Sequence, residues 1–157
     1  MKIFPEIYRQ FRLIDTKERS INRLNRRTEY SKRLYSQYTD KSFRGEVSST
    51  HFKLISSSIG RGAFCVSTGK LKEREGSVKV KIHPFFKYAL YFFYALPIVG
   101  FFVEFILVSE NNWPILILVA IGQMLFIRYL FIGLAFRILA RESLHRLRDV
   151  LDIEFTV

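Results

Sequence analysis

Three histidines are the side chains of this sequence best suited to metal binding or acid–base chemistry. His51, His83 and His145 are widely separated, and none belongs to the closely spaced group of His, Cys, Asp and Glu residues that a metal site requires. His83 stands directly before Pro84, where polar sequence gives way to apolar sequence, which favours a structural role at that junction. The spacing therefore predicts no metal site.

The segment SSSIGRG, Ser56–Gly62, has the composition of a phosphate-binding loop but not its pattern. It lacks G-x-x-x-x-G-K-[ST], so Arg61 is expected to be a solvated turn residue rather than an anion ligand. Ser56, Ser57 and Ser58 have no neighbouring base in a recognisable catalytic pattern. The single cysteine excludes an internal disulfide and suits a reducing compartment. We expect no catalytic residue and no cofactor, and we do not expect an enzyme.

The positive charge of the chain is concentrated in its first half. Residues 1–84 contain nineteen Lys and Arg against eight Asp and Glu, whereas residues 85–157 contain six of each, so the first half carries the whole net charge of +11. A basic protein can bind nucleic acid. Basic residues beside apolar segments are, however, what membrane topology predicts, and nucleic acid is therefore not expected as a partner.

Two long apolar segments follow the basic half. Residues 85–108 and 114–139 each contain only two charged residues, and each exceeds the ~20 residues that an α-helix needs to cross a bilayer. A buried helix pair in a soluble protein is the alternative, but two such segments would overwhelm a domain this small. The sequence predicts a transmembrane hairpin over residues 85–139, with a short polar turn at Ser109–Trp113.

The charges around this hairpin predict its orientation. The turn contains no Lys or Arg, whereas basic residues precede the first span and follow the second, which predicts that both termini lie in the cytoplasm. Basic groups near an anionic leaflet contribute about 1 kcal/mol each to membrane attraction. We expect six of them to contact anionic lipid headgroups, although they could equally serve only to set topology: Lys70, Lys72, Arg74, Lys79, Lys81 and Lys87.

Apart from Lys87 and Arg137 near the ends of the predicted spans, three polar side chains stand out within them. Glu104 is near the outer turn, and Arg128 is some 15 Å further from that turn along the helix axis, so the two cannot pair within one hairpin. Both can extend toward the nearer interface. The alternative is that Glu104, Gln123 and Arg128 contact other copies of the chain or a partner protein in the bilayer.

The remaining sequence predicts an α+β domain. Alternating apolar and polar residues from Ser42 onward predict a four-stranded antiparallel meander with one apolar and one basic face. The residues expected on the apolar face are Phe43, Gly45, Val47, Phe52, Leu54, Ser56, Phe64, Val66, Thr68, Val78, Val80 and Ile82. Residues 2–13 could form a further strand, which Pro5 would confine to an edge.

Helices are predicted before and after this meander. Asp15 and Glu18 have the spacing of a reciprocal N-terminal cap, followed by a short helix. Leucines at 144, 147 and 151 predict an amphipathic C-terminal helix that covers the sheet or lies on lipid, and residues 153–157 could add an edge strand. The expected domains are a basic cytoplasmic domain (1–84), the hairpin (85–139) and a cytoplasmic helix and tail (140–157).

Three sequence stretches are similar to a family of small, uncharacterised, Bacteroidota-like bacterial membrane proteins. They are RLNRRTE (Arg23–Glu29), FRGEVSSTHFKL (Phe43–Leu54) and GKLKEREGSVKVKIHPFF (Gly69–Phe86), in which a strand ends in His-Pro before the membrane. The resemblance implies a fold with a cytoplasmic β-domain and two spans, and an inner-membrane location, but no activity or site residue.

Two functions remain open at this point. The first is a non-enzymatic inner-membrane protein whose β-domain acts at the membrane surface in interaction, sensing or assembly, as a homo-oligomer or with a membrane partner. The second is a membrane-disrupting effector of a bacterial conflict system that oligomerises through its hairpin, where the polar residues inside the spans would line a pore.

Overall fold

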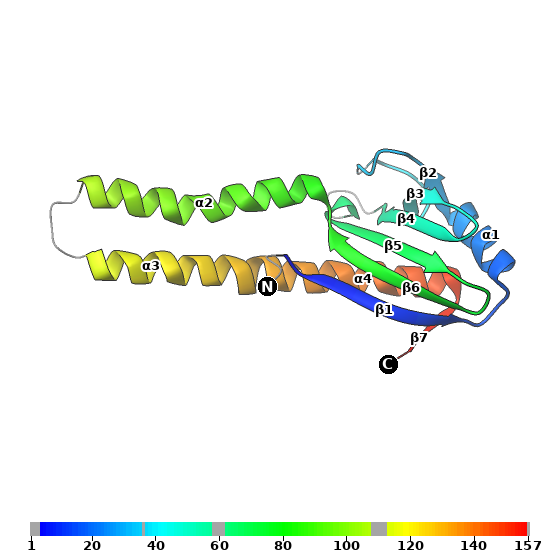
Figure 1. Cartoon of the computed structure of the whole chain (residues 1–157). Coiled ribbons are helices and arrows are strands. Elements are labelled where there is room, and N and C mark those ends of the chain that lie inside the picture. Colours follow the sequence, from blue (N-terminus) through cyan, green and yellow to red (C-terminus); the bar gives the residue numbers. More distant parts are fainter. Residues whose placement is uncertain (1–3, 36, 58–61, 108–112, 157) are drawn as a thin grey trace. The chain divides into compact units, whose positions relative to one another are not determined.

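The protein divides into two compact units. The computed structural model describes residues 4–35, 37–57, 62–107 and 113–156. A sheet unit comprises residues 1–83 and 136–157, and a helical unit comprises residues 84–135 (Figure 1). The chain therefore leaves the sheet unit after His83 and returns to it at Phe136, with the apolar residues between these two points.

The sheet unit contains a mostly antiparallel sheet of seven strands in the described chain. Their spatial order is β2-β3-β4-β5-β6-β1-β7, in which only β2 and β3 are parallel (Figure 1). The strands are β1 (Glu6–Leu13), β2 (Thr28–Tyr30), β3 (Phe43–Val47), β4 (His51–Ser56), β5 (Cys65–Leu71), β6 (Glu75–Ile82) and β7 (Ile153–Thr156). The α+β class that the sequence predicts is confirmed, and β3 to β6 form the expected meander.

The sheet extends beyond this meander on both sides. Strand β1 was expected at an edge, but it pairs with β6 on one side and β7 on the other, so that prediction is wrong. Pro5 stands just before the strand and removes no hydrogen bond from either ladder. Strand β7 takes the edge position instead, as the alternation of residues 153–157 allows. Strand β2 at the other edge was not predicted.

The orientation of β5 also differs from the prediction. Val66 and Thr68 were expected on the core face of the sheet, but Cys65, Ser67, Gly69 and Leu71 occupy it. Thr68 is exposed on the other face, whereas Val66 is buried there, opposite the buried Ile55. The core face requires Gly69 at this point because it lies opposite Phe52, whose buried ring occupies the space that a Cβ atom would fill. A second cross-strand pair is built in the same way, because the ring of Phe11 on β1 occupies the space that a Cβ atom at Gly76 on β6 would fill.

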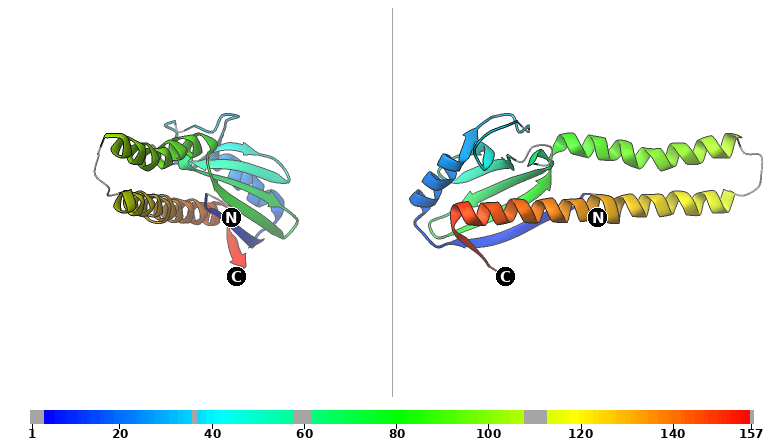
Figure 2. Two further views of the ribbon diagram at one scale, coloured as in Figure 1. Left: turned by 60° about the vertical axis from the view of Figure 1, so that its left-hand side comes forward. Right: turned by 180° about the vertical axis from the view of Figure 1, so that it is seen from behind.

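Helices α1 (Lys17–Arg27) and α4 (Ala135–Leu151) pack within the sheet unit. The leucines at 144, 147 and 151 are buried, and α4 lies across one face of the sheet (Figure 2). The Ser20 hydroxyl of α1 donates a hydrogen bond to the Leu151 carbonyl oxygen at 3.3 Å, which joins the two helices. The amphipathic helix that the sequence predicts therefore covers the sheet.

The start of α1 is not the capping box predicted from Asp15 and Glu18. Thr16 is the N-terminal cap residue, and its side chain makes no capping hydrogen bond. Asp15 instead accepts a hydrogen bond from the Thr16 amide at 2.7 Å and lies 3.3 Å from the Arg23 guanidinium. The Asp15 carboxylate therefore links the turn before α1 to Arg23 within the helix.

The helical unit contains two long apolar helical segments. Helix α2 (Pro84–Leu107) continues through Pro97. Helix α3 (Trp113–Phe126) is followed by the π-helical segment η2 (Ile127–Leu134), and the chain stays helical through to Leu151. Ring contacts between Phe93 and Phe131, with centroids 6.2 Å apart, join α2 to η2. The predicted turn falls mostly on residues 109–112, which lie outside the described residues.

Candidate functional site

The face of the sheet opposite α1 and α4 carries the lysines expected at the membrane surface. This outer face is formed by the residues that alternate with the buried core, because successive side chains of a strand point to opposite sides. Lys70 of β5 and Lys79 and Lys81 of β6 lie on it, Lys72 follows β5 directly, and Arg74 lies in the exposed turn before β6. The sixth predicted residue, Lys87, lies in the first turn of α2, in the helical unit.

The strand register keeps these lysines apart. Lys70 is opposite His51 and Ser77, and Lys79 is opposite Thr68 and Tyr8, so the directly paired positions hold no second lysine or arginine. Like charges at directly opposite positions would destabilise the sheet. The outer face can therefore carry a high positive charge at little cost in stability.

Acidic neighbours neutralise only part of this charge. The Lys79 ammonium lies 3.2 Å from the Glu6 carboxylate, and its side chain is 35% exposed. Lys70 and Lys81 are exposed and form no ion pair with any described residue. Solvent-facing lysines without partners leave a positive field above the middle of the sheet, which favours an anionic surface or ligand.

Two further basic residues on this face were missed by the sequence reasoning. Lys53 of β4 lies in the same cross-strand row as Lys79, through Thr68, and Arg12 of β1 lies beyond Gln10. The period-2 alternation was sufficient to place each on the polar side of its own strand. Their place beside the lysines of β5 and β6 depends on strand order, which the local pattern does not contain.

The helical unit leaves its apolar side chains uncovered. Only 11% of the most apolar stretch of α2 is buried, and only 6% of that of the helix from Trp113 to Leu151. Both helices are long and apolar enough to cross a membrane. The core helix of a soluble protein would be mostly buried, so these two helices differ from that class in their exposure.

Glu104, Gln123 and Arg128, the polar residues singled out within the predicted spans, lie in different surroundings. Glu104 is exposed on α2 and forms no ion pair with any described residue, so it does not pair with Arg128. Arg128 lies in the π-helical segment, with its guanidinium 5.8 Å from the centre of the Tyr129 ring. Gln123 lines an apolar hollow of about 500 Å³ between α2 and α3, beside Pro97 and Gly122.

Cys65 and Ser56 are both enclosed by the sheet unit. Cys65 is 2% exposed, and burial raises the pKa of its thiol to about 12, which favours the protonated thiol at neutral pH. Ser56 accepts a hydrogen bond from the Arg146 guanidinium at 3.0 Å. Ser58 and Arg61 lie outside the described residues. Among the described residues, no three His, Cys, Asp or Glu side chains are grouped to hold a metal ion.

His83 terminates β6 at the boundary between the two units. Its backbone amide donates a hydrogen bond to the Phe64 carbonyl oxygen at 2.9 Å, which extends the strand pairing by one residue. Burial, and then the positive charge of Lys53, lowers the pKa of the imidazole. The junction role predicted for His83 agrees with these contacts.

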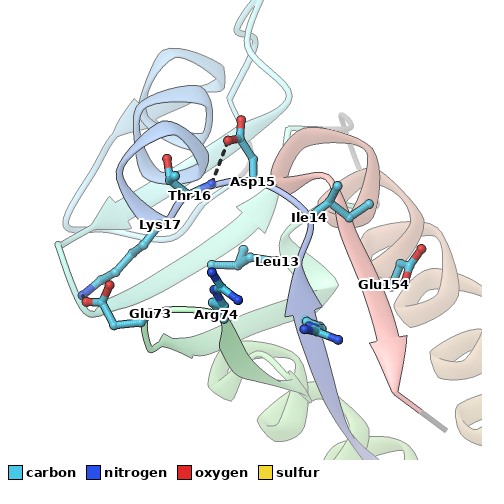
Figure 3. Close-up of a pocket in the computed structure, with 9 residues that line it drawn as sticks. Leu13, Ile14, Asp15, Thr16, Lys17, Glu73, Arg74 and Glu154 are labelled. Atoms are coloured by element: carbon cyan, nitrogen blue, oxygen red, sulfur yellow. Dashed lines mark hydrogen bonds and ion pairs between the residues drawn. The ribbon is translucent and has the colours of Figure 1, made fainter.

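A polar hollow of about 740 Å³ lies at the turn between β1 and α1 (Figure 3). Its charged lining residues include Asp15 and Glu73, with Lys17 3.9 Å from Glu73. Because both signs of charge are present and Asp15 already binds the Thr16 amide, this hollow indicates no particular ligand class.

No protein-family model, no curated protein and no solved structure matches this chain.

Proposed function

We propose that this chain is a non-enzymatic, two-span protein of the bacterial inner membrane, and that its sheet unit works at the cytoplasmic surface in interaction, sensing or assembly. The observation that carries the proposal is the exposure of the apolar helices. A helical unit that buries so few of its side chains needs a cover of similar polarity, and lipid hydrocarbon supplies it without any further protein.

The connections between the units support the orientation. Strand β6 ends at Ile82 and α2 begins at Pro84, so a single residue separates the sheet from the first apolar helix. Basic residues lie on the sheet-unit side of both connections, and the positive-inside rule assigns that side to the cytoplasm. Such a short connection keeps the sheet unit close to the headgroups, where its exposed lysines attract anionic lipid.

Membrane insertion and topology are tested together. We expect the chain to remain in the membrane fraction after alkaline carbonate extraction. A reporter inserted between Asn111 and Asn112 should behave as periplasmic, and one fused after Val157 should behave as cytoplasmic. Release by carbonate would refute the two-span proposal, and the reversed reporter pattern would refute its orientation.

Surface docking requires a separate experiment on the full chain in proteoliposomes. Lys70→Glu with Lys81→Glu removes two attractions of about 1 kcal/mol each, which lowers the docked fraction relative to the undocked by about thirtyfold. In anionic liposomes, but not in neutral ones, proteinase K should therefore digest the sheet unit of this variant faster than that of the parent. The matched control reverses Arg26 and Arg27 on α1. Equal effects of the two variants would show that the outer face has no special role.

The alternative, a membrane-disrupting effector, is favoured by the exposed Glu104 and Gln123 of the helical unit. In a bilayer such groups gain most from polar partners on another copy. Controlled expression with a membrane-potential dye decides between the functions. Depolarisation that disappears in Glu104→Ala would favour the effector, and an unchanged potential would favour the surface protein.

A further inference from the structure

A second basic region lies on the opposite side of the sheet unit from the outer-face lysines. It surrounds a hollow of about 260 Å³ between α4 and the edge of the sheet formed by β1 and β7. Its basic lining consists of Arg9, Arg137, Arg141, His145 and Arg148, and no carboxylate among the described residues lines it. We call this region the arginine hollow.

The arginine hollow is assembled from distant parts of the sequence. Arg137, Arg141 and Arg148 are four and seven residues apart, so they share one face of α4. Arg9 comes from β1 and points to the helix-bearing side of the sheet, because it alternates with Tyr8 and Gln10 of the outer face. The tertiary fold thus concentrates four guanidinium groups around one small space.

These guanidinium groups are not neutralised within the protein. Arg9, Arg137 and Arg141 form no ion pair and no side-chain hydrogen bond with any described residue. Arg148 lies 3.5 Å from Asp149, which is outside the hollow. By contrast, Arg146 on the adjacent face of α4 binds both Glu142 and Ser56. Four like charges with one partner repel each other, and an anion bound among them would relieve that repulsion.

The shape and chemistry of the lining favour a phosphate group. Guanidinium is a planar fork whose N–H groups bind phosphate oxygens in pairs, and the imidazole of His145 offers a further hydrogen-bonding nitrogen. The hollow is several times the ~30 Å³ that one water molecule occupies. Ile7, Leu144 and Phe155 complete the lining, so apolar surface lies beside the charge. An amphiphilic phosphate compound would contact both kinds of surface.

We propose that the arginine hollow binds a phosphate group carrying negative charge, supplied either by an anionic phospholipid headgroup or by a soluble phosphate compound. All of its lining residues belong to the sheet unit, and Arg137 also lies at the end of the second predicted span, on the side of the sheet unit. It is also separate from the outer-face lysines, whose attraction to lipid needs no defined site.

The test uses the full chain in a neutral detergent and native mass spectrometry. The protein is titrated with dioctanoyl phosphatidic acid, with zwitterionic dioctanoyl phosphatidylcholine, and with inorganic phosphate. We expect phosphatidic acid to bind more tightly than phosphatidylcholine. Arg9→Gln with Arg141→Gln should weaken that binding at least about tenfold, because charge-assisted hydrogen bonds are lost.

The matched control is Arg26→Gln with Arg27→Gln, which removes the same charge from exposed positions of α1. It should change the affinity less than about twofold. Arg9→Lys with Arg141→Lys keeps the positive charge but removes the planar guanidinium groups that bind two phosphate oxygens at once. This variant should retain only part of the affinity. Protection of the buried Cys65 from alkylation confirms that each variant is folded.

The two phosphate sources give different results. Binding of phosphatidic acid alone identifies a lipid headgroup, whereas inorganic phosphate binding that the Arg9 and Arg141 variant weakens identifies a soluble compound. Equal losses in the hollow variant and the α1 control would overturn the proposal. So would the absence of any binding that depends on Arg9 and Arg141.

Discussion

The cross-strand pair of Phe52 and Gly69 provides a sensitive test of the sheet core. Phe52 is fully buried on β4, and a Cβ atom at Gly69 would overlap its ring. Gly69→Ala therefore forces the ring to move, at a cost of about 1–3 kcal/mol for an overpacked core. Lower backbone entropy of the unfolded chain offsets up to about 1 kcal/mol of this. We expect a net loss of about 1–2 kcal/mol in the free energy of unfolding.

The native Cys65, four residues away on the same strand, reports this change directly. Its thiol is 2% exposed and its pKa is raised to about 12, so maleimide reacts only when the strand opens. A loss of 1–2 kcal/mol raises the open population, and hence the alkylation rate, about 5- to 30-fold. Thr68→Ala, on the exposed face of β5, should leave the rate within about twofold of the parent. Rates in denaturant should be equal for all variants.

A second substitution tests the stated cause. Phe52→Leu removes the atoms with which the new methyl group collides, so Gly69→Ala should cost much less in that background. The coupling free energy between the two substitutions in a double-mutant cycle should therefore be about 1 kcal/mol or more. Alkylation of Gly69→Ala at the parent rate would refute the reasoning, and so would strictly additive effects in the double variant.

Three further changes are predicted, two for the same alkylation assay and one for the pH dependence of unfolding. Gly45→Ala should destabilise the sheet by about 3 kcal/mol, since Gly45 has a φ of +149° and a Cβ there would overlap the Lys53 backbone; parent-like rates would contradict this. Asp152 has a φ of +56° between α4 and β7, so Asp152→Val should cost about 1–2 kcal/mol while Asp152→Gly should not, and equal effects would argue against the conformational cause. Because the pKa of His83 is lowered, the unfolded chain binds more protons than the folded chain as the pH falls below 6.5, so stability should fall there. His83→Gln should flatten that dependence of the unfolding midpoint, and an unchanged pH profile would exclude His83 as its source.

Local signals in the sequence predicted most of the secondary structure. The strands of the meander follow from alternation between apolar and polar residues, which is complete within five to eight residues of chain. The leucine spacing from 144 to 151 is likewise a local pattern, and it predicted α4. The apolar helices needed only length and composition. None of these features depends on which distant segment packs beside them.

The errors concern pairing rather than local conformation. Val66 and Thr68 fit an alternating pattern in either direction, and the ring of Phe52 over Gly69 shows that Gly69, not Thr68, lies on the face shared with the core. The edge position expected for β1 was wrong because β7, from the other end of the chain, pairs with it. The capping role expected for Asp15 was wrong because α1 begins at Lys17, so that Thr16 is the cap residue, and the Asp15 carboxylate lies close to Arg23 instead.

The sequence by itself determined the division of the chain into a basic α+β part and two apolar helices, since charge and hydrophobicity are properties of each residue in turn. Only the tertiary structure placed Lys53 in the same cross-strand row as Lys79, and Arg9 around the same hollow as Arg137 and Arg141. These neighbours are separated by tens of residues in the sequence. Strand order and the packing of α4 bring them together, and neither is contained in any local pattern.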